Sequence, residues 1–175
     1  GVKSEVHRTV EARAHLIAMD AEYQQQGSWN PFGGEGGLHY SEIKEGSAYL
    51  SQKGSDLMNL VVGDTVEISW TELSLSSGIN RETSNLTIQA IVPTKASGSA
   101  DGGDVAVYTN LQQAQEILNR QGEVNRITIS AKGGVLDAQD AEKRVMPIIN
   151  STLDEAIIGE DAGLEVTAVP DDFSV

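Results

Sequence analysis

The chain has 175 residues, with 26 acidic and 12 basic side chains, a formal net charge of −14 and no cysteine. This charge disfavours nucleic acid and anionic lipid heads as partners, because both are polyanions, and its simplest role is to keep the surface solvated. Disulfides are excluded, no apolar run approaches the roughly 20 residues that a membrane-spanning helix needs, and the length suffices for a core in one domain or two small lobes.

The first predicted strand covers Val10–Met19, where apolar and polar side chains alternate with the period of a half-buried strand. The residues predicted to face inward are Val10, Ala12, Ala14 and Leu16. A glycine-rich loop follows at Gly27–Gly37 and carries Trp29 and Phe32. Exposed aromatic residues on a loop are candidate contacts for a partner protein, and the alternative is that they pack onto the edge of the core.

A short strand at Ala48–Leu50 and a helix at Ser51–Leu60 come next. The helix is predicted to turn Leu57 and Leu60 inward, and a turn at Val62–Asp64 follows it.

A hairpin is predicted after this turn. Its first strand is Thr65–Trp70, with Val66, Ile68 and Trp70 inside, and Gly78–Asn80 marks a bend in its loop. The return strand, which Pro93 closes, is predicted to bury Leu86, Ile88, Ala90 and Val92 on one face.

The stretch Asp104–Ser130 reads as strand, helix and strand. Thr109 or Asn110 is placed to cap the helix, and Gly122 is its natural end. The segment Tyr49–Ser69 has the same order of strand, helix, glycine turn and strand, although two copies are too few for a solenoid. A second helix at Asp137–Ile157, kinked or split by Pro147, and a last strand at Leu164–Val169 complete the predicted elements.

No residues form a recognisable metal or cofactor motif, so neither a metal nor a cofactor is predicted. His7 and His15 would lie about 26 Å apart on one strand, too far to share an ion, and no HExxH motif includes His39. Asp101 and Asp104 lack the twelve-residue pattern of a calcium loop.

Two further patterns are short enough to occur by chance. Ser41 and Lys44 have the SxxK spacing of a serine–lysine pair, but the companion SDN and KTG elements are absent. The triplets that begin at Asn85 and Asn150 fit the N-glycosylation acceptor. No catalytic residue is therefore predicted.

Four segments together resemble the extracytoplasmic core domain of MacB-like and FtsX-like ABC-transporter permeases. Each segment is an apolar pattern with one or two polar anchors, and their order and spacing over most of the chain carry the resemblance. The segments are Gly1–Lys3 with the strand leading to Met19–Tyr23, Ala48–Val66, Asp104–Leu118, and Val124–Ser130 with Ala138–Glu142. The chain departs from the family in a longer glycine-rich loop at Gly33–Gly37. It also lacks the usual preceding transmembrane helix and first strand, as we expect of a piece of a longer protein.

The resemblance implies an α+β fold with two lobes. Residues 1–26 and 123–175, from both chain ends, would form a βαβ-type lobe beside the membrane. Residues 27–122 would form an inserted β-rich lobe. Both chain ends would then lie close together.

The resemblance also implies a function without catalysis or a cofactor. Such a domain lies outside the cytoplasmic membrane, between the first and second transmembrane helices of the permease. Its implied partners are those helices, the cytoplasmic ATPase subunit, and an extracytoplasmic partner protein or cargo, with no nucleic acid. It relays ATP-driven motion by rigid-body or hinge movement.

Two other classes of function stay open from the sequence. A free-standing extracellular ligand-binding or sensory α+β domain would show a deep pocket lined by Trp29, Phe32 or Trp70, with convergent polar groups. A hydrolase would need the side chains of Ser41 and Lys44 close together and enclosed.

Overall fold

The computed structural model describes residues 1–4, 9–11, 13–20, 32, 38–74, 78–93, 105–125, 143–149 and 151–152. The chain divides into two compact units, Gly1–Asn125 and Arg126–Val175. In the second unit, residues 143–149 and 151–152 are helical and include Pro147. The rest of the predicted helix Asp137–Ile157 and the predicted strand Leu164–Val169 lie outside the described residues. None of the described helices has the length and apolar composition needed to cross a bilayer.

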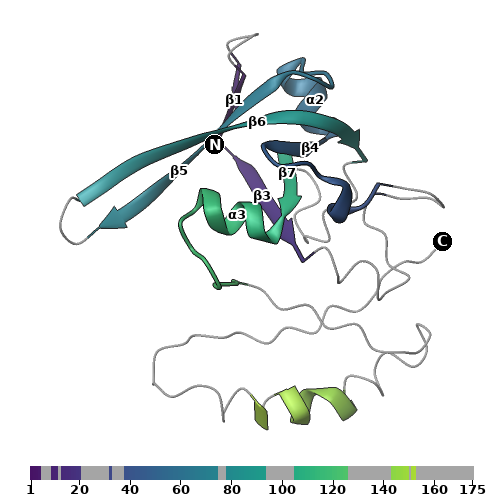
Figure 1. The fold of residues 1–175 in the computed structure, drawn as a ribbon, viewed down its shortest axis with the longest axis vertical. Coiled ribbons are helices and arrows are strands. Elements are labelled where there is room, and N and C mark those ends of the chain that lie inside the picture. Colours follow the sequence, from purple (N-terminus) through teal and green to yellow (C-terminus); the bar gives the residue numbers. More distant parts are fainter. Residues whose placement is uncertain are drawn as a thin grey trace. The chain divides into compact units, whose positions relative to one another are not determined.

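The first unit is built on a mixed seven-stranded sheet with the order β2-β1-β5-β6-β4-β7-β3 (Figure 1). Its strands are β1 (Val2–Ser4), β2 (Val10–Glu11), β3 (Ala14–Met19), β4 (Ser47–Ser51), β5 (Thr65–Ser74), β6 (Gly78–Val92) and β7 (Val105–Asn110). Its helices are η1 (Tyr40–Glu42, a 3-10 helix), α2 (Gln52–Met58) and α3 (Leu111–Ile117). The α+β class is thus confirmed.

The predicted two-lobe arrangement is not confirmed. β1 and β3 come from residues 1–26, which the prediction assigns to the membrane-proximal lobe. In the structure they pair with β5 and β7, which come from residues 27–122, within the same sheet. Most of residues 123–175, including the chain's last residues, lie outside the described part, so the meeting of both chain ends stays a prediction.

The single strand predicted at Val10–Met19 is divided into β2 and β3, which lie at opposite ends of the sheet order. Only residues 12 and 13 separate them, so Glu11 and Ala14 are within about 11 Å of each other along an extended chain. The sheet therefore curls until its two end strands approach, as in an incomplete barrel. Val10 is 65% exposed, so its predicted burial is wrong. It belongs to β2, the end strand that pairs with β1 among the described residues.

Two hydrophobic clusters form the core of the first unit, and they occupy opposite faces of β4 and β7. Alternation along these strands sends Ala48, Leu50, Val105 and Val107 to one face and Tyr49, Ala106 and Tyr108 to the other. We call the first the aliphatic cluster: Val2, Ala48, Leu50, Met58, Leu60, Val66, Ile68, Leu86, Ile88, Val105 and Val107. We call the second the aromatic cluster: Phe32, Tyr40, Ile43, Tyr49, Val92, Ala106 and Tyr108.

Helix α2 packs on the aliphatic cluster through Gly54 and Met58, one turn apart. The prediction that Leu57 faces inward is wrong, since this side chain is 55% exposed, whereas Leu60 is buried as predicted. The helix begins one residue later than predicted, after Ser51, whose side chain accepts a hydrogen bond from the Gly54 backbone N–H.

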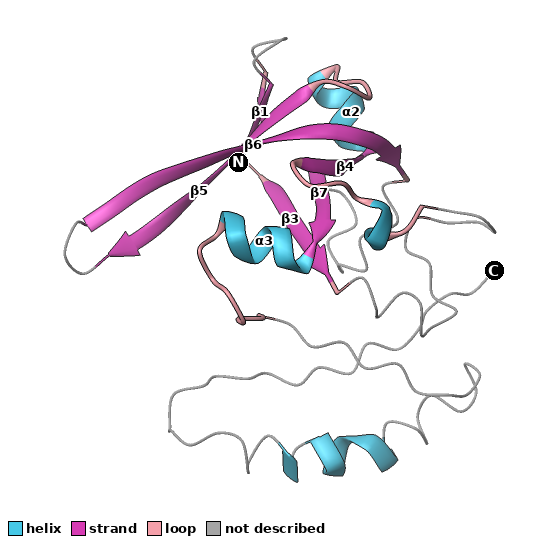
Figure 2. Ribbon diagram, viewed as in Figure 1, coloured by secondary structure: helices cyan, strands magenta, loops and turns pink. Residues whose placement is uncertain are grey.

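The hairpin strands β5 and β6 are longer than predicted, and their distal part extends as a two-stranded ribbon beyond the other strands (Figures 1 and 2). Gly78 and Asn80 belong to β6 itself, so the bend predicted there is wrong. A bulge at Gln89 also reverses the alternation of β6, because Ala48 pairs with Ile88 but Tyr49 pairs with Ala90.

The bulge corrects the predicted burial of the return strand. Leu86 and Ile88 belong to the aliphatic cluster, whereas Val92 and the half-buried Ala90 belong to the aromatic side. A one-residue insertion moves every later side chain to the opposite face, so the four residues do not share one face as predicted.

The two segments with the same order of strand and helix, Tyr49–Ser69 and Asp104–Ser130, contribute neighbouring strands to the sheet. β4 and β7 run antiparallel, and the equivalent residues Tyr49 and Tyr108 are directly paired. Each helix has seven residues and is capped by the last residue of its strand, Ser51 or Asn110, which accepts from the backbone N–H three residues later. The two units are therefore related by a local pseudo-twofold axis between the two tyrosines.

Candidate functional site

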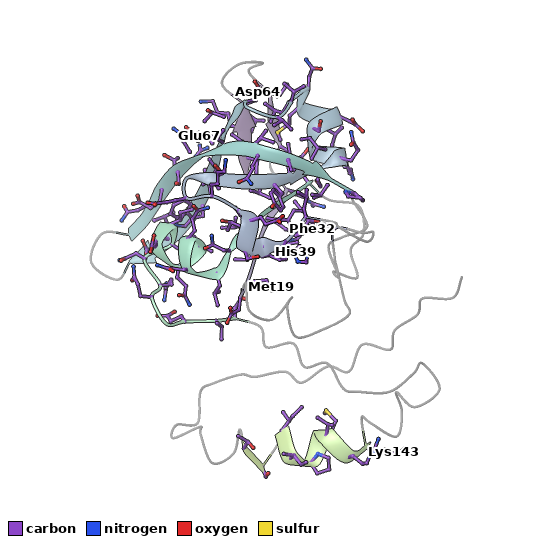
Figure 3. All side chains as sticks on the ribbon, turned by 45° about the vertical axis from the view of Figure 1, so that its right-hand side comes forward. Met19, Phe32, His39, Asp64, Glu67 and Lys143 are labelled. Carbon is purple, nitrogen blue, oxygen red and sulfur yellow. The ribbon has the colours of Figure 1, made fainter. Side chains whose placement is uncertain are left out.

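Phe32, predicted as a candidate partner contact, lies in the aromatic cluster and is only 5% exposed. Its ring centroid is 4.8 Å from that of Tyr40, 5.2 Å from Tyr49 and 5.3 Å from Tyr108, with edge-on contacts to the last two. Figure 3 labels Phe32 near His39, whose carbonyl accepts a hydrogen bond from the Tyr49 hydroxyl at 3.0 Å. This burial matches the alternative in which the loop aromatic packs onto the core. Trp29 lies outside the described residues, and the partner-contact role of both stays a prediction.

The three tyrosines of the aromatic cluster are held in their neutral form. Burial raises the pKa of Tyr108 to about 12. The pKa of Tyr49 is also raised to about 12, mainly by burial and to a smaller extent by the negative charge of the nearby Glu42 carboxylate. Burial, with a smaller effect of Tyr108, raises the pKa of Tyr40 well above its usual value. A raised pKa makes each phenol a poorer base or nucleophile near neutral pH, so the cluster has the character of a packed core.

The serine–lysine pair considered for a hydrolase is not enclosed. Ser41 in η1 and Lys44 after it are both exposed, and neither lines a described cavity. The Lys44 backbone N–H donates to the Gln89 side chain at 2.8 Å, which ties this turn to the bulge in β6. The segment is therefore built as a structural turn.

The described residues contain no group of three or more histidine, aspartate or glutamate side chains placed to hold a metal ion. His7, Asp101 and Asp104 lie outside the described part. Of the two acceptor triplets, Asn85 and Thr87 are exposed on β6 with Leu86 buried between them, and Asn150 is not described.

A cavity of about 300 Å³ opens where the curled sheet fails to close. It lies between the start of β3 and the middle of β5, which do not pair with each other, and the first residues of β1, which pairs with β5, also line it. Apolar and polar residues both line it, with apolar ones in the majority. The lining residues are Gly1, Val2, Ala14, His15, Leu16, Ile68, Ser69, Trp70, Thr71, Val107 and Leu118. This volume is at the lower end of the range for ligand pockets.

Of the three aromatic residues named for the ligand-binding alternative, Trp70 lines this cavity. The cavity is open to solvent rather than deep, so that alternative stays a prediction. The other cavity residues escaped the sequence reasoning, because residues 1–2, 14–16 and 68–71 come together only through the curl of the sheet. The one available signal was the amphipathic run Val10–Met19, whose β3 part supplies one wall. No known family model matches this chain, and neither does any curated protein sequence.

Proposed function

We propose that this chain is the extracytoplasmic domain of an ABC-transporter permease of the MacB/FtsX type, a non-catalytic coupler between ATP-driven motion and a partner or cargo. The observation that carries the proposal is the order and spacing of its four family-like segments. Two of these segments, Ala48–Val66 and Asp104–Leu118, contain the strand–helix units β4–α2 and β7–α3.

The build of the first unit supports a mechanical role. β4 and β7 are buried on both faces, and each is continuous with a capped helix. Buried Gln113 of α3 donates to the Ser47 carbonyl at 2.8 Å and accepts from the Gly46 backbone N–H at 2.7 Å, so it fastens α3 to the turn before β4. Close-packed elements with such polar ties move as a body, as rigid-body coupling requires.

The absence of cysteine in the chain permits a clean test of location. The full-length gene product would carry a cysteine at exposed Glu82, with any cysteine outside these 175 residues replaced by serine, and intact cells would be treated with a membrane-impermeant maleimide. The matched control is Val66→Cys, whose side chain is fully buried and nearly unchanged in size. The proposal predicts labelling of the Glu82→Cys protein in intact cells and of the Val66→Cys protein only after denaturation. Labelling of the Glu82→Cys protein only after cell lysis contradicts the extracytoplasmic location.

The coupling role has a separate test. The full-length protein, solubilised from its own membrane, is expected to copurify with an ATPase subunit. The ATPase rate of that complex should fall when the Gln113 tie is removed by Gln113→Ala, and exposed Gln112→Ala should leave it unchanged. A protein that copurifies with no ATPase, and whose flanking sequence holds no transmembrane helices, contradicts the permease assignment.

A free-standing ligand-binding domain is the second candidate, and the cavity beside Trp70 favours it. In a Trp29→Phe variant Trp70 becomes the sole tryptophan, because the chain has two. A saturable change in its fluorescence with a small apolar ligand supports this candidate, and an unchanged spectrum across a ligand panel removes its support.

A further inference from the structure

Strand β6 carries the acceptor triplet Asn85-Leu86-Thr87, and the burial of its three side chains alternates as in any strand with one covered face. Leu86 is 2% exposed and belongs to the aliphatic cluster, whereas Asn85 and Thr87 on either side of it are exposed. The amide and the hydroxyl that define the acceptor therefore lie on one face of β6, and both are open to solvent.

Among the described residues, that face of β6 becomes covered only after the bulge at Gln89. Val92 and the half-buried Ala90, which follow the bulge, lie on the side of the aromatic cluster. Before the bulge the same face stays exposed at Asn85 and Thr87. The same triplet in β4 or β7 would be closed to an enzyme, because both faces of those strands are buried.

The cross-strand neighbours of the two acceptor residues are polar. Asn85 pairs with Glu67 of β5, and Thr87 pairs with Thr65 of the same strand. The Glu67 carboxylate is engaged on the far side of β5, where it lies 3.9 Å from the ammonium of a lysine of β1. Neither the Asn85 amide nor the Thr87 hydroxyl forms a hydrogen bond with a described residue, so the fold commits neither group elsewhere.

We propose that Asn85 carries an N-linked oligosaccharide in the full-length protein. An oligosaccharide is bulky and hydrated, so it requires an exposed polar face of this kind. The donor is a sugar linked to a lipid through phosphate, and the Thr87 hydroxyl is the group by which the transferring enzyme recognises the triplet. The Asn85 Nδ2 displaces the lipid phosphate from the anomeric carbon. A C–N bond replaces the C–O bond, the lipid phosphate departs, and one amide proton is released.

The test uses the full-length protein purified from its own cells. Trypsin cleaves after Arg81 and Lys95 and so releases residues 82–95, which contain the whole triplet. Mass spectrometry, with fragmentation that leaves sugars attached, is expected to find this peptide heavier by a whole number of sugar residues, with the added mass on Asn85. A peptide found only without sugar, or with its sugar on a serine or threonine, overturns the proposal.

Variants test the recognition of the triplet. Asn85→Gln and Thr87→Val should both abolish the added mass, and Thr87→Ser should retain it. Thr83→Val is the matched control, because it makes the same change on an exposed residue of the same face but outside the triplet. Valine keeps the branched shape of threonine, and circular dichroism verifies that each variant folds. A sugar that persists in Thr87→Val, or that is lost equally in Thr83→Val, contradicts the assigned acceptor.

This inference rests on the proposed extracytoplasmic location, because the acceptor triplet is used in secreted chains. Comparison with the maleimide experiment separates the two. Labelling of the Glu82→Cys protein in intact cells, together with an unmodified peptide 82–95, overturns the glycosylation and leaves the proposed location standing. Labelling only after lysis, together with an unmodified peptide, overturns both.

Discussion

The two clusters that cover opposite faces of β4 and β7 are built from different side chains. The aliphatic cluster draws on β1, β4, β5, β6 and β7 and on α2, and its members carry no polar side-chain atom. The aromatic cluster contains three tyrosines and Phe32, and the Tyr108 hydroxyl is buried without a hydrogen-bond partner in the described part of the chain.

The two faces of the sheet are therefore stabilised in different ways. Aliphatic side chains contribute through buried area and close packing alone. Tyrosines contribute a large apolar area, but each buried hydroxyl must also find a partner, or the desolvation cost is uncompensated. We therefore expect side-chain truncation to lower the free energy of unfolding most in the aliphatic cluster. Removal of a hydroxyl group should affect stability only in the aromatic cluster.

The largest effect is expected from Leu50→Ala in the aliphatic cluster. Leu50 is 1% exposed, so its removal leaves a cavity and should lower the free energy of unfolding by about 3 kcal/mol, measured by urea denaturation. Phe32→Leu in the aromatic cluster keeps most of the volume and should cost about 1 kcal/mol. An equal or larger loss for Phe32→Leu would reverse the ranking of the two clusters.

A smaller loss is expected from Gly54→Ala in α2. Alanine is the better helix former, yet a Cβ at this position would lie 2.8 Å from Leu50 Cδ1 and 2.9 Å from Val105 Cγ1. Overpacking should outweigh propensity and lower the free energy of unfolding by about 2 kcal/mol. Exposed Asp56→Ala in the same helix is the control, and a Gly54→Ala protein more stable than the parent shows that α2 packs less tightly than described.

The hydroxyls of the aromatic cluster are expected to act in opposite directions. Tyr108→Phe removes an unpartnered buried group and should raise the free energy of unfolding by about 1 kcal/mol. Tyr49→Phe removes the hydrogen bond to the His39 carbonyl and should lower it by about 1 kcal/mol. Urea denaturation of both variants measures the difference, and effects of the same sign would show that the two hydroxyls have similar environments.

The last prediction concerns stability at alkaline pH, and its effect near neutral pH is the smallest of the four. Burial raises the pKa of Tyr49 and Tyr108 to about 12, whereas an unfolded tyrosine titrates near pH 10. The unfolded chain therefore loses protons first, so this stabilisation is complete below pH 10 and declines as the pH rises from 10 to 12. Urea denaturation at pH 9, 10 and 11 measures this decline in the free energy of unfolding. The Tyr108→Phe variant should show a shallower decline than the parent. A free energy of unfolding that stays constant up to pH 11 rules out the raised pKa values.

Alternation and capping rules located most of the described elements. They placed β4 and α2 close to their observed bounds and β5 at its observed first residue, Thr65, because each is set by local periodicity and a nearby cap or turn. The rules did not predict the bulge at Gln89, because a bulge depends on the neighbouring strand. They also predicted the wrong burial for Leu57, because the face that α2 turns inward depends on the packing of Leu50 and Val105 against Gly54.

The candidate site was much less predictable. Trp70 was named from the sequence, but residues 1–2, 14–16 and 68–71 meet only because the sheet order places β2 and β3 at opposite ends. The sequence by itself determined the acidic charge, which follows from composition, and the two strand–helix units, which follow from contacts within a few residues. The α+β class was expected from the family resemblance. The tertiary structure alone decided the curl of the sheet and the cavity between β3 and β5, because pairing between strands distant in the chain depends on how the whole sheet closes.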